Sequence, residues 1–227
     1  MPPPPPIKAV VFDLDGLMFN TEDIFELTGR ELLRRRALEF TGELRTKMMG
    51  RRAIEAYEIL VETTGVQETA EALLAESQTI FDALLAEHLS PMPGLFDLLD
   101  CIEQQRLPKV VATSSSRGYL EGMLERFELS HRFPMTLAAE DVSHGKPHPE
   151  IYLTAAERMQ VRPDEMLVFE DSETGTRAAT AANAVVVSVP HRHSRDHSFE
   201  GAACVARGLN DPQVLRLIAG GNPQVGL

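Results

Sequence analysis

Two aspartates one residue apart, Asp13 and Asp15, follow an apolar run at residues 7–12. Residues i and i+2 of a strand point to the same face, so a continuing strand would place both carboxylates side by side. Two like charges about 4 Å apart repel by about 4 kcal/mol at an effective dielectric constant of about 20. The pair therefore requires a cation, a shared proton or full exposure to solvent.

Polar groups also follow two later apolar runs. Thr113 to Ser116 come after residues 108–112, Glu170 to Ser172 come after residues 165–169, and Lys146 lies between them in the proline-flanked loop GKPHPE. Carboxylates in this number are the hard oxygen ligands that suit Mg²⁺. Because ionised acids at one place repel one another, we expect a Mg²⁺ ion there. If the substrate is a phosphate ester, Lys146 is also needed against the added negative charge.

The sequence around these groups predicts an α/β fold. Four short apolar runs rich in β-branched residues alternate with helix-like stretches, at residues 7–12, 108–113, 165–170 and 183–189, and residues 133–140 form a weaker fifth run. This pattern predicts a Rossmann-like parallel sheet covered on both faces. Ligands bind outside the carboxyl ends of the strands in such sheets, so three strands bring polar groups to one rim.

A long insert separates the first two predicted strands. It spans roughly ninety residues, far more than a normal crossover connection. Three segments of it have apolar residues at helical spacing, residues 24–36, 53–65 and 69–89, and the Pro/Gly segment SPMPG closes it at residues 90–94. We expect residues 17–90 to form a helical cap domain inserted into an α/β core of residues 1–16 and 91–227.

Composition excludes several kinds of partner. The net charge is −12 and the chain has no long basic run, which disfavours nucleic acid. Two cysteines are too few for a disulfide framework and fit a reducing compartment. No segment has the pattern of a signal peptide or the length of a membrane span. We expect a cytoplasmic monomer without a membrane partner.

Four segments in order, DLDG, VVATSSS, GKPHPEIY and LVFEDSETG, resemble the four motifs of the haloacid dehalogenase superfamily. The insert resembles the small helical cap of one of its subfamilies. The segments KMMGRRAIEAYEILVE and AESQT, with MPG after them, resemble the subgroup of pseudouridine-monophosphate and sugar-phosphate phosphatases, and the β-phosphoglucomutases share the core motifs. The resemblance implies a Mg²⁺-dependent phosphoric monoester hydrolase acting on a small phosphorylated metabolite, a sugar phosphate or a nucleoside monophosphate.

The resemblance also implies a role for each rim residue. Asp13 would be the nucleophile that becomes an aspartyl phosphate, and Asp15 would protonate the leaving oxygen and later activate water. Thr113 and Ser114 would hold the phosphoryl oxygens. Lys146 would neutralise the transferring group. The Mg²⁺ ligands would be Asp13, the Asp15 carbonyl, Glu170 and Asp171.

Three positions bear on the reaction type. The β-phosphoglucomutase relatives carry a cap histidine and a cap lysine where this chain has Phe25 and Met49. Hydrolysis is therefore expected, and a β-phosphoglucomutase-like phosphosugar mutase is the alternative. Dehalogenases of the superfamily lack an acid at the position of Asp15, so dehalogenation is not expected.

The remaining candidates lie outside the charged rim. Gly16 closes the first motif and is expected at the substrate phosphate. Gly50 and Arg51 either face the substrate from the cap or, for Arg51, lie on the surface. Asn20 replaces the aspartate that usually follows the first motif. Residues 191–197, HRHSRDH, are predicted to be a solvated loop, because no cysteine or carboxylate pattern completes a zinc set there.

Overall fold

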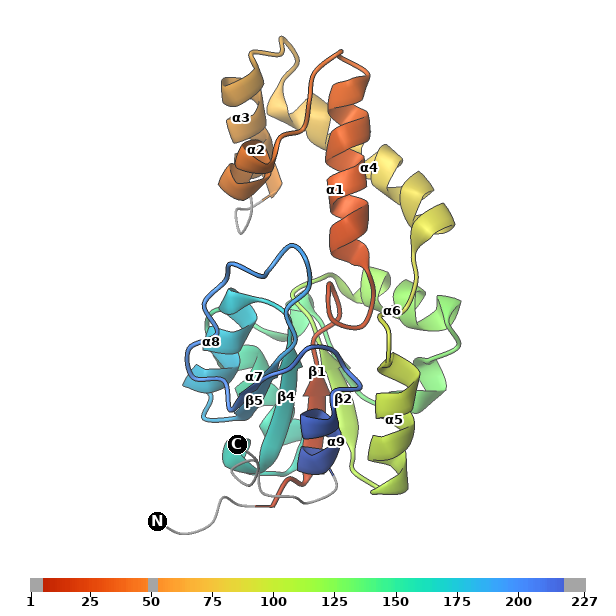
Figure 1. The fold of residues 1–227 in the computed structure, drawn as a ribbon, viewed down its shortest axis with the longest axis vertical. Coiled ribbons are helices and arrows are strands. Elements are labelled where there is room, and N and C mark those ends of the chain that lie inside the picture. Colours follow the sequence, from red (N-terminus) through yellow and green to blue (C-terminus); the bar gives the residue numbers. More distant parts are fainter. Residues whose placement is uncertain (1–5, 49–52, 219–227) are drawn as a thin grey trace. The chain divides into compact units, whose positions relative to one another are not determined.

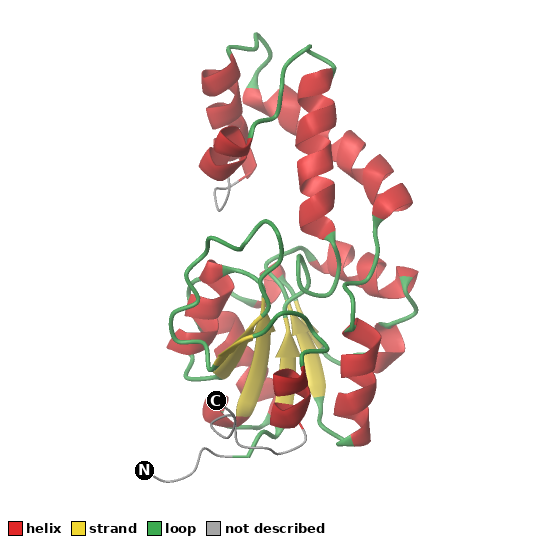
Figure 2. Cartoon of the chain, in the orientation of Figure 1, coloured by secondary structure: helices red, strands yellow, loops and turns green. Residues whose placement is uncertain are grey.

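The computed structural model describes residues 6–48 and 53–218, which belong to two compact units (Figure 1). The first unit comprises residues up to Phe19 and from Pro91 onward, and the second is Asn20–Ser90. Figure 2 shows that the strands all belong to the first unit, whereas the second is built from helices. Among the described residues, no helix is long and apolar enough to cross a membrane.

The first unit contains a six-stranded sheet in the order β3-β2-β1-β4-β5-β6, with every neighbouring pair parallel. The prediction of a parallel α/β sheet is confirmed, including the weaker fifth strand. The sixth strand was not predicted, because its two residues are partly or largely exposed and belong to no longer apolar run rich in β-branched residues. The strands are β1 (Ala9–Phe12), β2 (Lys109–Ala112), β3 (Thr136–Leu137), β4 (Met166–Glu170), β5 (Val185–Ser188) and β6 (Cys204–Val205).

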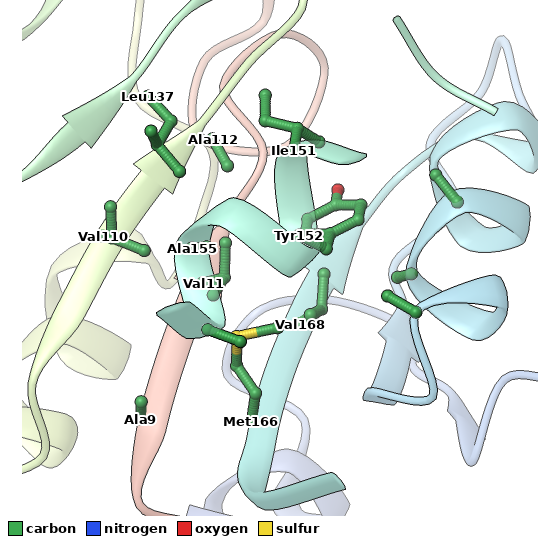
Figure 3. Packing of buried hydrophobic residues seen from close by; sticks show 14 of the residues in the cluster. Ala9, Val11, Val110, Ala112, Leu137, Ile151, Tyr152, Ala155, Met166 and Val168 are labelled. Atoms are coloured by element: carbon green, nitrogen blue, oxygen red, sulfur yellow. The ribbon is translucent and has the colours of Figure 1, made fainter. Parts of the chain in front are cut away.

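Helices cover both faces of this sheet, which explains why its strands are apolar throughout. On one face, Ala9 and Val11 of β1 pack under Tyr152 and Ala155 of α7 (Figure 3). On the other, the ring of Phe12 stacks on Phe169 with centroids 5.2 Å apart. The α-helices of this unit are α5 (Leu95–Gln104), α6 (Arg117–Arg126), α7 (Glu150–Met159), α8 (Glu173–Ala181) and α9 (Pro212–Ile218), with short 3₁₀ helices at Ser130–Arg132, Ala139–Asp141 and Pro163–Glu165.

The second unit has its own apolar core. Leu32 and Leu33 of α1 pack with Leu60 of α3 and Leu73 of α4, all four fully buried. The three predicted helices of this segment are confirmed. The short α2 was missed, since Leu44 is its one buried residue. The helices are α1 (Thr21–Arg34), α2 (Gly42–Met48), α3 (Ala53–Thr64) and α4 (Ala70–His88).

The chain leaves and re-enters the first unit at neighbouring points. Phe19 and Pro91 form an antiparallel bridge, and the Met92 N–H donates to the Met18 carbonyl at 2.8 Å. Within the second unit, the Asn20 N–H donates to the Ser90 carbonyl at 3.1 Å. Each unit therefore has its two chain connections tied together by its own hydrogen bonds.

Candidate active site

Asp13 lies at the carboxyl end of the central strand β1. Its N–H donates to the Phe169 carbonyl at 3.0 Å, so the pairing of β1 with β4 continues for one residue past the strand. The residue is only 7% exposed. The middle of a parallel sheet, at the carboxyl ends of its strands, is where ligands bind in such folds.

Lys146 connects Asp13 with a second buried carboxylate. Its ammonium group donates to Asp13 Oδ1 at 2.5 Å, to Glu170 Oε1 at 2.6 Å and to the Ala112 carbonyl at 3.2 Å. The Lys146 side chain is 6% exposed and that of Glu170 is fully buried. One cation is therefore held between two acids, with all three of its protons in hydrogen bonds.

Burial and charge act against each other on these groups. Burial alone lowers the pKa of Lys146, but the charges of Asp13 and Glu170 outweigh burial and hold that pKa well above its usual value. Burial raises the pKa of Asp13, Lys146 opposes the rise, and Glu170, Asp171 and Asp15 add to it. The ammonium group stays charged, whereas full ionisation of Asp13 calls for further positive charge at the site.

Three carboxylates converge at this point. One oxygen each of Asp13, Glu170 and Asp171 lies within 4.8 Å of the other two, and all three residues are buried. Glu170 also accepts hydrogen bonds from the Tyr152 hydroxyl and, at 3.1 Å, from the Ser172 hydroxyl. Three acids against one ammonium leave an excess of negative charge on oxygen donors, so these residues fit a hard divalent cation such as Mg²⁺.

Two glycines allow this close approach. A Cβ atom on Gly175, in the first turn of α8, would lie 1.9 Å from the Glu170 carboxyl carbon. Gly16 has a φ of +74°, and a Cβ atom there would lie 2.4 Å from Asp171 Oδ2. Backbone can therefore pass directly beside both carboxylates, where any larger residue would displace them.

The hydrogen-bond partners of Asp15 differ from those of Asp13. Asp15 Oδ2 accepts a hydrogen bond of 2.6 Å from the Ser115 hydroxyl, and Asp15 Oδ1 accepts one of 3.0 Å from the Tyr119 hydroxyl. Ser115 follows β2, and Tyr119 lies in the first turn of α6, one helical turn later. Asp15 thus has two hydroxyl donors and no hydrogen bond from Lys146 among the contacts of the described residues.

The Thr113 loop lies beside Lys146. Thr113 is 1% exposed; its N–H donates to the Leu137 carbonyl at 3.0 Å, and its hydroxyl accepts from the Ser115 N–H at 3.0 Å. Thr113, Ser114 and Lys146 line a cavity of about 140 Å³. The loop therefore offers hydroxyl groups at the wall of a small cavity, beside a buried ammonium group.

The sequence-predicted residues thus fall into three groups. Asp13, Lys146, Glu170 and Asp171 come together around one point, and Thr113 and Ser114 share a cavity with Lys146. Asp15 is positioned by Ser115 and Tyr119. Gly50 and Arg51 lie outside the described residues.

The prediction of a solvated loop at residues 191–197 is wrong for its first part. His191 Nε2 lies 2.8 Å from Asp171 Oδ2, and the His191 side chain is 10% exposed. His193 is 7% exposed, and its Nε2 accepts a hydrogen bond of 2.9 Å from Arg192. The sequence position of this segment could have indicated the contact. The segment follows β5, which pairs with β4, so it begins at the same edge of the sheet as Glu170 and Asp171.

Ser115, Tyr119 and Tyr152 are further site residues that the sequence pattern did not indicate. Tyr152 is a fully buried core residue of α7 (Figure 3), and its hydroxyl donates to Glu170. Its place in an apolar helix face gave no sign of a polar partner. Ser115 lay inside a predicted motif without a role, and Tyr119 stands one helical turn beyond it.

The second unit contains a cavity of its own, of about 400 Å³. Phe25 stacks on Phe81 at its wall, with ring centroids 4.6 Å apart. Its other lining residues include aromatic and charged side chains: Phe40, Tyr57, Glu22, Glu26 and Arg45. The cavity thus combines aromatic faces with charged groups.

Comparison with known proteins gives a consistent result. Residues 10–189 match the family described as haloacid dehalogenase-like hydrolase. The chain is 31% identical to a phosphorylated carbohydrates phosphatase of Thermotoga maritima, over 78% of this chain and 82% of that protein. It is 30% identical to a probable pseudouridine-5'-phosphatase of Drosophila melanogaster, over 90% and 91%. Its fold resembles a crystal structure of a putative beta-phosphoglucomutase from Thermotoga maritima, with a TM-score of 0.78, 27% identity, and 94% and 97% of the chains covered.

Proposed function

The chain belongs to the haloacid dehalogenase-like hydrolase family, and on that premise we propose that it is a phosphoric monoester hydrolase for small phosphorylated metabolites. The observation that carries the proposal is the group of Asp13, Glu170 and Asp171 around one point, with Lys146 bound to two of them. A dianionic phosphate needs positive charge at this acidic rim. Lys146 and a divalent cation supply it.

In the first half-reaction, a carboxylate oxygen of Asp13 attacks phosphorus. An Asp13–phosphorus bond forms and the ester P–O bond breaks. The hydrogen bond from Lys146 fixes the rotation of the carboxylate and stabilises negative charge that moves onto the phosphoryl oxygens. The hydroxyl groups of Thr113 and Ser114, with the Ser114 N–H, hold those oxygens.

Asp15 moves the protons. It gives a proton to the oxygen of the leaving alcohol, and it then takes one from the water that attacks the phosphoaspartate. The second step breaks the bond between Asp13 and phosphorus and releases inorganic phosphate. The hydrogen bonds from Ser115 and Tyr119 hold Asp15 in place between the two steps.

Asp13, Asp171 and Glu170 are the proposed Mg²⁺ ligands. When bound, the ion would lower the charge repulsion between these acids and the substrate phosphate. His191 would hold Asp171 from the side through the 2.8 Å contact. Such an outer partner orients a ligating carboxylate.

We assign the choice among phosphate esters to the second unit, Asn20–Ser90, as the cap domain. Its cavity of about 400 Å³ has the size of a small-molecule site and is lined by aromatic and charged side chains. The named relatives act on phosphorylated carbohydrates and, as a probable activity, on pseudouridine 5'-phosphate. A sugar phosphate or a nucleoside monophosphate is the corresponding proposal for this chain.

Trapping of the phosphoenzyme tests the mechanism. With an aryl phosphate, whose leaving group needs little protonation, the Asp15→Asn variant should accumulate phosphate on the protein, detected by intact mass. The Asp13→Asn variant should accumulate none, because it lacks the nucleophile. Phosphate on the Asp13→Asn protein would contradict the assignment.

The similarity to a putative beta-phosphoglucomutase keeps a mutase as the second candidate. Both activities pass through phosphorylated Asp13, and they differ in whether water or a sugar phosphate accepts the phosphoryl group. The protein should be incubated with β-glucose 1-phosphate and a trace of glucose 1,6-bisphosphate. Release of inorganic phosphate supports the hydrolase, whereas glucose 6-phosphate with little free phosphate makes the mutase correct.

A further inference from the structure

A second group of metal-binding side chains lies in the loop that carries Lys146. His144, His148 and Glu150 each place one ligand atom within 4.8 Å of the other two. Nothing in the proposed phosphatase reaction uses them. The side chains are 67%, 51% and 28% exposed, so an ion can reach them from solvent.

Glu150 is held rigidly at this point. Its Oε1 accepts a hydrogen bond of 2.7 Å from the Ser143 N–H, and its Oε2 accepts one of 3.0 Å from the His144 N–H. Two main-chain donors therefore fix the plane of the carboxylate. A ligand that is already oriented loses less conformational entropy when an ion binds.

Both imidazole rings face the same oxygen of that carboxylate. His144 Nδ1 lies 2.7 Å and His148 Nδ1 lies 3.8 Å from Glu150 Oε2, and the two ring centroids are 4.6 Å apart. An ion pair between His144 and Glu150 would account for the first ring alone. His148 Nδ1 accepts a hydrogen bond of 3.3 Å from the Glu150 N–H, which holds the second ring with its Nδ1 atom beside the same carboxylate.

The spacing fits a small transition-metal ion. Ligand bonds of about 2.0–2.1 Å in a tetrahedral site place ligand atoms roughly 3.3 Å apart, and the distances of 2.7 Å and 3.8 Å to Glu150 Oε2 lie on either side of that value. Two imidazoles and one carboxylate select Zn²⁺ or a similar ion, whereas Mg²⁺ prefers oxygen ligands throughout. We propose that His144, His148 and Glu150 form a second, transition-metal site that binds Zn²⁺ and is separate from the carboxylate site at Asp13.

A metal ion at this site would affect the loop that carries Lys146 without contacting Lys146 itself. Its ligands stand two residues before Lys146 and two and four residues after it. The ammonium group of Lys146 contacts Asp13 and Glu170. A bound ion would tie the loop together on both sides of Lys146 and so restrict its movement. The inference is independent of the proposed phosphatase activity.

Zn²⁺ binding to the full chain tests the proposal, measured by titration calorimetry with Mg²⁺ in large excess to fill the carboxylate site. His144→Gln and His148→Gln should each weaken binding by at least about tenfold, the lower end of what loss of even an outer partner of a metal ligand costs. His131→Gln and His88→Gln, which alter exposed histidines elsewhere, should leave the affinity unchanged. Thermal melts without Zn²⁺ check that each variant folds.

A second measurement identifies the ligands directly. In nitrogen-15 spectra of the imidazole side chains, the signals of His144 and His148 should shift together at the same Zn²⁺ concentration, with those of His88 and His131 unmoved. Ligand variants that bind Zn²⁺ as tightly as the wild-type protein, or wild-type protein that binds no Zn²⁺ in excess Mg²⁺, would overturn the proposal. Signals that shift only at His191 or His193 would do the same, because they would place the ion at the other site.

Discussion

The Ser115 hydroxyl donates a hydrogen bond of 2.6 Å to Asp15 Oδ2, although one hundred residues separate the two in sequence. The contact joins the loop after β1 to the loop after β2, since these strands are neighbours in the sheet. Asp15 must take and give protons in the proposed reaction, so its orientation is expected to matter more than its mere presence.

Ser115→Ala should lower kcat by about tenfold, the effect expected when a hydrogen bond to a charged group worth ~1.5 kcal/mol is lost. KM should change little, because Ser115 is proposed to position Asp15 and not to bind substrate. The loss should be larger for a sugar phosphate than for an aryl phosphate, which needs little proton donation. Steady-state kinetics with both substrates measure this difference.

Ser116→Ala is the matched control for that variant. Ser116 is the next residue and precedes α6, yet its side chain makes no capping hydrogen bond. Removal of the Ser116 hydroxyl should leave the ratio of kcat for the sugar phosphate to kcat for the aryl phosphate unchanged. Equal losses in both variants would show that Ser115 only maintains the loop.

Loss of one proposed metal ligand should appear as a change in metal affinity. Asp171→Asn should raise the Mg²⁺ concentration for half-maximal activity by at least about tenfold, because a charged ligand is replaced by a neutral one. Chelator should abolish wild-type activity and Mg²⁺ should restore it. Asp164→Asn, at an acid whose side chain is 50% exposed, is the control and should behave as wild type. Full activity of chelated wild-type protein would remove the metal from the mechanism.

Gly175→Ala should destabilise the protein and lower its activity together. The new Cβ atom would meet the fully buried Glu170 carboxylate at 1.9 Å, and relief of such an overlap costs about 1–3 kcal/mol. Displacement of Glu170 should also disturb Lys146, which it binds at 2.6 Å. Urea unfolding and kcat/KM report the two effects.

Gly122→Ala is the control for Gly175→Ala. It gives the same gain in helix propensity without a steric overlap. Gly122 lies inside α6, where an added Cβ atom meets nothing within 4 Å. It should therefore stabilise the protein by about 0.4–1 kcal/mol with unchanged activity. A similar gain for Gly175→Ala would show that the first turn of α8 moves aside without cost.

Asn20 should not tolerate aspartate, although aspartate is the usual residue of related motifs. Its Nδ2 donates to the His88 carbonyl at 3.2 Å, while its Oδ1 accepts from the Ser90 N–H at 2.7 Å. A carboxylate cannot donate and would face the carbonyl oxygen. Asn20→Asp should lower the free energy of unfolding at neutral pH by about 0.5–1.5 kcal/mol, as expected for one lost hydrogen bond.

The pH dependence of that variant identifies the cause. A protonated carboxyl group can donate to the His88 carbonyl, so the folded state raises the pKa of the introduced acid above its usual value of about 3.9. The difference in the free energy of unfolding between wild type and Asn20→Asp should therefore shrink as the pH falls through this raised pKa. Asn20→Ala, which loses both bonds without adding a titrating group, should show the same deficit at each pH. A deficit of Asn20→Asp that does not depend on pH would contradict this account.

The strands and the acidic rim followed from sequence because both depend on local pattern. Buried parallel strands are continuous apolar runs, and their carboxyl ends share one edge, so Asp13, Glu170 and Asp171 had to approach one another. Strand β6 and helix α2 escaped prediction because they bury little apolar surface: neither residue of β6 is buried, and Leu44 is the buried residue of α2.

The partners of the rim acids could not be predicted in the same way. The Tyr152 hydroxyl reaches Glu170 because α7 packs on the sheet at one particular height, which apolar spacing alone does not specify. The contact of His191 with Asp171 depends on the path of a loop after β5. Long-range contacts of this kind follow from the packing of whole elements, whereas residue spacing determines only which face a side chain occupies.

The bridge between Phe19 and Pro91 makes the second unit a replaceable module. Because the first unit joins its own two chain ends there, a short linker in place of residues 20–90 would close a small loop at little entropic cost. The insertion point thus lets recombination or design exchange the helical unit for one of another size, while β1 and the groups that follow it keep their register. Variation in substrate choice among such enzymes can then arise at a position where the sheet does not have to be rebuilt.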